Sequence, residues 1–106
     1  MVNDKDVKNI KMHEYVREFC EQHSVEFKSI TERRRDRGWV IRLRQRLFYE
    51  LHIRGHSLPE IGEFLNRDHT TVLWGKRRHL KRIEEINAQE KRRERNELRS
   101  ARARNS

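Results

Sequence analysis

Four consecutive polar side chains are suited to contacts with the edges of nucleic-acid bases, and they belong to the run Asp68-His69-Thr70-Thr71. A carboxylate can accept a hydrogen bond from a cytosine amino group, an imidazole can donate or accept at a base edge, and a threonine methyl can contact a thymine methyl. The run stands directly before Val72 and Leu73, so we expect it in the exposed first turn of a helix whose buried side includes these two residues and Trp74. Asp68 then has two open roles, as the helix N-cap alone or as cap and base contact together.

The residues just before this run predict a second helix. Ser57 and Glu60 have the spacing of a capping box, and Pro59 suits a first helical turn. Apolar residues then recur at three- and four-residue spacing, at Leu58, Ile61, Phe64 and Leu65. Gly62 lies beside this stripe, where we expect it to let another helix cross closely.

The connection between the two helices is very short and contains Asn66, a residue that tolerates the left-handed conformation. Two helices joined in this way form a helix-turn-helix. In such motifs the first turn of the second helix enters the major groove of DNA and touches base edges.

Positive charge is concentrated in two blocks. The 106 residues include 26 Lys and Arg against 17 Asp and Glu, a formal net charge of +9. Residues 28–46 hold eight basic and two acidic side chains, and residues 67–82 hold six and one. Such blocks attract polyanions. The polar run 31–38, expected to be a loop, has four arginines in five positions, which suits a phosphate backbone or a solvated loop.

Helical periodicity predicts the remaining elements. A first helix lies between Asp6 and Gln22 with Asp4 or Asp6 as its N-cap, and a short helix over 24–30 is capped by Ser24. A third helix covers about residues 41–53 and ends at Gly55. We expect these residues to face the core: Val7, Ile10, Tyr15, Val16, Phe19, Cys20, Val25, Phe27, Ile30, Leu47, Phe48 and Leu51.

The helix that starts after Asp68 has no evident stop signal. Leu80, Ile83 and Ile86 can continue its packed side, but residues 88–106 contain only one sizeable apolar residue, Leu98. The predicted organisation is a tail at 1–6, a domain at 7–87 and a charged extension at 88–106. We expect the extension to be partly helical, with residues 99–106 disordered.

The segment Leu58-Pro59-Glu60-Ile61-Gly62, followed by Arg67-Asp68-His69-Thr70-Thr71-Val72, closely resembles the C-terminal DNA-binding domain of DnaA, the bacterial replication initiator. Arg42-Leu43-Arg44-Gln45 is similar to the basic segment of that family, and residues 15–29 are similar to its first two helices. The resemblance implies a small all-α bundle, DnaA-domain-IV-like and Trp-repressor-like, with a helix-turn-helix. The chain departs from the family in a turn before Arg67 that is one residue shorter, in a longer 33–38 stretch, and in a 45–57 segment that is one residue shorter.

The resemblance also implies site residues. Arg42 would enter the minor groove, while Asp68, His69 and Thr70 would read bases in the major groove, and the Pro59 ring would contact a thymine methyl. The residues expected at phosphates are Arg44, Gln45, Arg67, Thr71, Lys76, Arg77 and Arg78.

The function that follows is sequence-specific binding of double-stranded DNA at a DnaA-box-like site, by a monomer that regulates transcription or replication. No Gly-x-x-x-x-Gly-Lys-Ser/Thr loop is present, so we expect no ATPase activity and a stand-alone module of the kind that phages and mobile elements encode. The alternative is a protein-interaction factor that uses its charged extension to engage host transcription or replication machinery. RNA binding by the arginine-rich extension is a third and less favoured hypothesis, because no aromatic stacking platform accompanies those arginines.

Other classes of protein are disfavoured. Cys20 is the only cysteine, which excludes an internal disulfide and a thiolate metal cage, and we expect its thiol to be buried. His52 and His56 have no acidic or thiol partner, so we expect neither metal nor cofactor, and no catalytic arrangement indicates an enzyme. No apolar run approaches the roughly 20 residues of a membrane span. A cytoplasmic, nucleoid-associated protein is the expectation.

Overall fold

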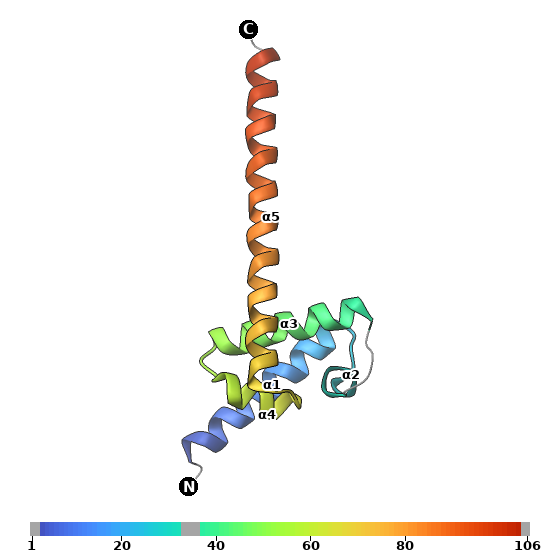
Figure 1. Ribbon diagram of the computed structural model, residues 1–106, viewed down its shortest axis with the longest axis vertical. Helices are drawn as coiled ribbons and strands as arrows, with labels where there is room; N and C mark the ends of the chain where they lie inside the picture. The colour runs from blue at the N-terminus through green and yellow to red at the C-terminus, as the bar shows by residue number, and fades with distance from the viewer. Residues whose placement is uncertain (1–2, 33–36, 105–106) are drawn as a thin grey trace.

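The computed structural model describes residues 3–32 and 37–104, and these residues form helices and no strand. In chain order the helices are α1 (Asp4–Gln22), α2 (Phe27–Thr31), α3 (Gly38–Ile53), α4 (Leu58–Leu65) and α5 (His69–Arg104) (Figure 1). The first four helices gather around the start of α5, which then projects away from them. The prediction of a small all-α bundle is confirmed.

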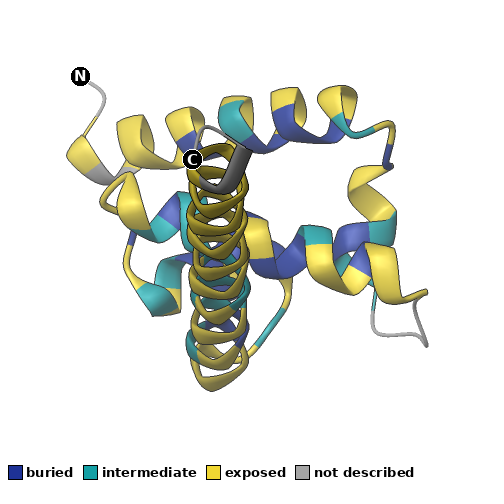
Figure 2. Cartoon of the chain, turned by 90° about the horizontal axis from the view of Figure 1, so that it is seen from above, coloured by how far each residue is buried: buried dark blue, intermediate teal, exposed yellow. Residues whose placement is uncertain are grey.

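The core lies where the helices meet, and the buried residues in Figure 2 gather on the sides of α1, α3 and α4 that face the bundle. Its most deeply buried side chains are Met12, Val16, Ile30, Leu47, Phe48, Leu51, Ile61, Leu65 and Val72. Most of these positions follow the predicted helical stripes. Periodicity therefore identified the buried face of α3 and α4 correctly.

The start of α1 differs from the prediction. Asn3 occupies the N-cap, because its side-chain oxygen accepts from the Asp6 amide at 3.3 Å and its carbonyl accepts from the Val7 amide at 3.2 Å. Val7 and Ile10 were expected in the core but are 38% and 54% exposed. The first turns of α1 extend beyond the other helices, so nothing covers them (Figure 1). Met12, which was not predicted, is the first residue of α1 to be buried.

Ser24 ends α1 instead of capping α2. Its φ is 51°, in the left-handed region. The Val25 amide donates to the Cys20 carbonyl at 3.0 Å and the Ser24 amide to the Glu21 carbonyl at 3.3 Å, which is the hydrogen-bond pattern of a Schellman motif. Helix α2 therefore starts only at Phe27, whose side chain is 41% exposed, against the prediction that it faces inward.

Helix α3 starts at Gly38, three residues before the predicted start, and Ile41 on its outer side is 39% exposed. Three of the four clustered arginines, at 33–35, lie outside the described residues. The end of α3 agrees with prediction. Gly55 has a φ of 101°, and the amide that follows it, of His56, donates to the Leu51 carbonyl at 3.2 Å.

Helix α5 is continuous over 36 residues, which corresponds to about 54 Å at the usual rise per residue. From Glu84 to Arg102 every side chain is exposed, including Ile86, which was expected to continue the packed side. The predicted disorder of residues 99–106 is wrong for 99–104, which are helical. After Gly75 the helix has neither glycine nor proline and is rich in Glu, Lys, Arg, Gln and Ala, which favour helix without tertiary support.

Candidate nucleic-acid interface

Helix α4 begins at the predicted cap. The Ser57 hydroxyl oxygen accepts from the Glu60 amide at 3.3 Å, and Pro59 lies in the first turn. The Glu60 carboxylate lies 3.9 Å from Nδ1 of His56. The bond from the Glu60 amide to the Ser57 hydroxyl confirms the serine half of the predicted capping box, and it fixes the residue at which the helix-turn-helix begins.

The turn between α4 and α5 depends on Asn66 and Gly62. Asn66 has φ 57° and ψ 47°, the left-handed conformation predicted from its type, and the Arg67 amide donates to the Gly62 carbonyl at 2.7 Å. A Cβ at position 62 would collide with the Arg67 carbonyl oxygen. Gly62 is therefore needed for the turn to close, and the prediction that it serves a helix crossing is wrong.

The same turn is tied to the end of α2. Two guanidinium nitrogens of Arg67 donate to the carbonyls of Thr31 at 2.9 Å and Glu32 at 2.6 Å, and the side-chain Nδ2 of Asn66 donates to the Thr31 carbonyl at 3.3 Å. Charged donors make stronger hydrogen bonds than neutral ones. These bonds fix the direction of the turn, so Arg67 has a structural role in addition to any contact with phosphate.

Arg44 and Gln45 were predicted to contact phosphates, but both are buried, at 8% exposure each. Arg44 Nε donates to the Ile30 carbonyl at 2.8 Å and its Nη2 donates to the Ser29 carbonyl at 3.1 Å. The Gln45 side-chain oxygen accepts from the Arg82 guanidinium. Burial of a charge requires such partners, and here they come from the fold itself. Both side chains are therefore engaged within the fold, and neither is exposed for a direct contact with phosphate.

The polar run at the start of α5 is exposed as predicted. The Asp68 carbonyl accepts from the Val72 amide at 3.1 Å, which places Asp68 at the N-cap position. Its carboxylate lies 3.1 Å from Nδ1 of His69, and both side chains are more than 60% exposed. A contact this exposed to solvent adds little to stability, so DNA can replace it at little cost. Thr70 and Thr71 are exposed beside it.

The remaining residues predicted to contact DNA come from α3, α4 and α5. Pro59, Arg42, Arg77 and Arg78 are exposed, and Lys76 is half-buried. Thr71 and Arg78 line one groove between α3 and α5. Arg42 lines a second one, together with Trp39, Leu43, Arg46, His79, Arg82, Ile83 and Ile86. The structure therefore gathers the major-groove candidates at one helix end and places Arg42 apart from them.

Two residues of α5 that bear on this surface were missed. Trp74 was expected on the buried side but is 58% exposed, with the Arg77 guanidinium carbon 5.5 Å from its ring centroid. Gly75 is buried where α5 crosses α3, next to the Phe48 ring. Helical spacing from Thr70 would have placed Trp74 on the exposed face, since the two are four residues apart.

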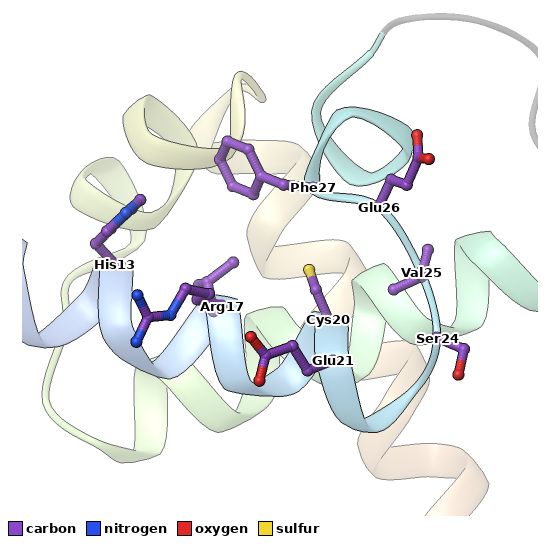
Figure 3. A pocket seen from close by; sticks show the side chains of 9 residues that line it. His13, Arg17, Cys20, Glu21, Ser24, Val25, Glu26 and Phe27 are labelled. Atoms are coloured by element: carbon purple, nitrogen blue, oxygen red, sulfur yellow. The ribbon is translucent and has the colours of Figure 1, made fainter.

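A cavity of about 360 Å³ lies between α1 and the segment leading into α2 (Figure 3). It is lined by His13, Arg17, Cys20, Glu21 and Phe27 among others, and by none of the residues predicted to contact DNA. Cys20 is 7% exposed, as predicted, and its burial raises the pKa of the thiol.

Among the residues that the structure describes, no group of three or more His, Cys, Asp or Glu side chains could hold a metal ion. Over the same ranges, no helix combines the length and apolar character that crossing a membrane requires.

The comparison with known families agrees with this geometry. Residues 14–78, more than half of the chain, match the family described as bacterial dnaA protein helix-turn-helix. The match runs from α1 through the turn into the third turn of α5, and it includes the complete exposed run 68–71. No curated protein and no solved structure gives a significant match. The chain therefore belongs to the bacterial DnaA family of helix-turn-helix DNA-binding domains.

Proposed function

We propose that this protein binds double-stranded DNA sequence-specifically, at a DnaA-box-like site, and so regulates transcription or replication. The observation that carries the proposal is the exposure of Asp68, His69, Thr70 and Thr71 together at the start of α5. They project from a helix end held by the Arg67 contacts to Thr31 and Glu32. A recognition element needs such rigid support, because small misplacements weaken base contacts.

Each side chain has a base partner of suitable chemistry. The Asp68 carboxylate accepts from a cytosine amino group, His69 bonds a base edge, and the Thr70 methyl contacts a thymine methyl. Pro59 at the start of α4 adds an apolar contact, and Arg42 reaches the minor groove from α3. Base contacts of this kind are worth about 1–3 kcal/mol of discrimination each.

The phosphate contacts come from Thr71 and from the basic residues of α5 that follow the exposed run 68–71. Thr71, Lys76, Arg77 and Arg78 contact the backbone and set the position of the protein on the duplex. These contacts carry no sequence information and weaken as salt rises, because binding releases condensed counterions. One copy of the chain occupies one asymmetric site.

A fluorescence-anisotropy titration tests the proposal with a duplex containing a DnaA box and a scrambled duplex of the same composition, at about 0.15 M salt. His69→Ala should cost about 1–3 kcal/mol on the box duplex only. Arg77→Ala should weaken binding to both duplexes and reduce the salt slope by about one. Arg92→Ala, which removes a charge from the exposed far part of α5, is the matched control and should change neither. Equal affinity of the parent protein for both duplexes would rule out sequence specificity.

The long exposed part of α5 supports a second candidate function, binding to a host transcription or replication protein. Every side chain from Glu84 to Arg102 is exposed, so the helix presents a surface that the fold does not use. Removing residues 88–106 takes away no buried side chain of the described region. If DNA affinity survives the deletion but regulation in cells is lost, the extension binds a partner protein. Survival of both would exclude this function.

A further inference from the structure

Trp74 is an unusual residue to find exposed on the recognition helix. It lies four residues after Thr70, on the same face of α5, and 58% of its side chain is exposed. Tryptophan carries a large apolar ring and is enriched at the energetically important centres of interfaces. The ring therefore offers a large apolar contact surface on the same face as Thr70 of the recognition helix.

Trp74 forms one wall of a groove of about 310 Å³ between α3 and the first turns of α5. Ile41, which is 39% exposed, adds apolar surface to the same groove. Among the described residues, the charged side chains that line it are those of Arg44, Arg67 and Arg78. Thr71 contributes a hydroxyl.

The three arginines differ in what they can do. Arg44 and Arg67 donate to carbonyls of the fold, so these two side chains are held in place at the groove. Arg78 is exposed and able to bond a ligand directly. The lining therefore combines an apolar wall, two immobile cations and one available cationic donor.

A strand of DNA has the complementary pattern, because each apolar deoxyribose ring is flanked by two anionic phosphates. A purely apolar partner would make no use of the exposed Arg78 guanidinium, and an isolated phosphate would make no use of the indole. The location also fits, since Thr71 lines this groove and also belongs to the exposed run 68–71 that we propose contacts DNA.

We infer that this groove binds one sugar–phosphate unit of the DNA strand beside the recognition turn, with the Trp74 ring packed on a deoxyribose and Thr71 and Arg78 at the adjoining phosphates. This inference rests on the proposed function and adds a binding site to it. Arg77, whose guanidinium carbon is 5.5 Å from the Trp74 ring centroid, is held by that ring toward the next phosphate.

The chain has two tryptophans, so Trp39→Phe leaves Trp74 as the only indole and a direct reporter. We expect its emission to change as the box duplex is added, with the same midpoint as the anisotropy of a labelled duplex, and acrylamide quenching to fall on binding. Trp74→Ala should weaken binding to the box and scrambled duplexes alike by about tenfold, the loss typical of one buried aromatic contact. Trp74→Phe should retain most of the affinity.

Leu98→Ala is the matched control, because Leu98 is a similarly exposed apolar residue on the same helix, at 61%. It should leave DNA affinity unchanged. Because Trp74 is exposed, Trp74→Ala should not alter thermal stability, which separates a contact with DNA from a structural role.

Several results would overturn the inference. Suppose that DNA binds normally, that Trp74 emission does not change, and that Trp74→Ala has unchanged affinity. The groove then does not bind DNA, and the proposed function is unaffected. A parent protein that associates with itself, and that becomes monomeric on Trp74→Ala, would assign the groove to a second copy of the chain. Failure of the parent to bind either duplex would refute both the inference and the proposed function.

Discussion

Replacement of Gly75 by alanine tests how closely α5 crosses α3. A Cβ at this position would lie 2.6 Å from Cδ2 and 3.0 Å from Cε2 of Phe48, and 3.3 Å from Cγ of Gln45. All three distances are shorter than the optimal carbon–carbon separation of about 3.5–4.0 Å, and the 2.6 Å approach is a collision. The Phe48 ring is only 1% exposed and belongs to the core, so a shift of the ring would disturb its packing.

Two opposing effects set the magnitude. Alanine is favoured over glycine in a helix interior by about 1 kcal/mol. An added methyl group in a well-packed core costs about 1–3 kcal/mol, and a contact this short belongs in the upper part of that range. We therefore expect Gly75→Ala to lower the free energy of unfolding by about 1–2 kcal/mol. For a domain of this size each kcal/mol lowers Tm by about 4–8 °C.

Thermal and urea unfolding followed by circular dichroism measure this change. Gly38→Ala is the control, because the nearest atom to its Cβ, a guanidinium nitrogen of Arg42, is at an ordinary 3.7 Å. It should be neutral or slightly stabilising. In the Gly75→Ala background, Phe48→Leu should cost less than it does alone, since the smaller side chain relieves the collision. A Gly75→Ala protein as stable as the parent would show that the crossing is looser than the structure has it.

Three further predictions concern buried polar groups. Arg44→Ala should lower the free energy of unfolding by about 2–3 kcal/mol in urea, because two α2 carbonyls lose a charged donor, and Arg44→Lys should recover only part. Burial lowers the pKa of His56 and of His79 below the ordinary 6.5, so the unfolded chain binds protons more readily. Stability should be full above about pH 6.5 and fall as the pH drops through that value, and His56→Gln should reduce the slope of urea unfolding against pH. Burial, together with the 2.6 Å hydrogen bond to Glu50, raises the pKa of Tyr15 to about 12. The stability that the protonated Tyr15 contributes should be lost as the pH rises from about 10 towards 12. Tyr15→Phe should remove the phenol that ionises near pH 12 in an absorbance titration.

Local signals in the sequence were sufficient for the helix-turn-helix. The Ser57 cap, the left-handed Asn66 and the N-cap position of Asp68 each depend on residues within about four positions, so the residue types alone indicate them. The same reasoning failed at Ser24, which also suits an N-cap. There the deciding factor was the end of the preceding helix, which required a left-handed residue at that position.

Packing between distant segments could not be derived in this way. Gly62 and Gly75 look alike in the sequence, yet one closes a turn and the other admits the Phe48 ring. Val7 and Ile10 have the spacing of a core face, but no helix covers them. Which face of a helix is buried depends on where the other helices end, and this is a property of the whole fold.

The sequence by itself determined the helices, the recognition turn and its resemblance to the DnaA domain, because these rest on short spacings and residue chemistry. Only the tertiary structure decided which cations remain available. Arg44 donates to carbonyls 14 and 15 positions away, and Arg67 donates to carbonyls 35 and 36 positions away. A guanidinium buried against such carbonyls supports the interface from within, whereas Arg77 and Arg78 stay exposed. The close crossing of α3 and α5 at Gly75 was settled in the same way.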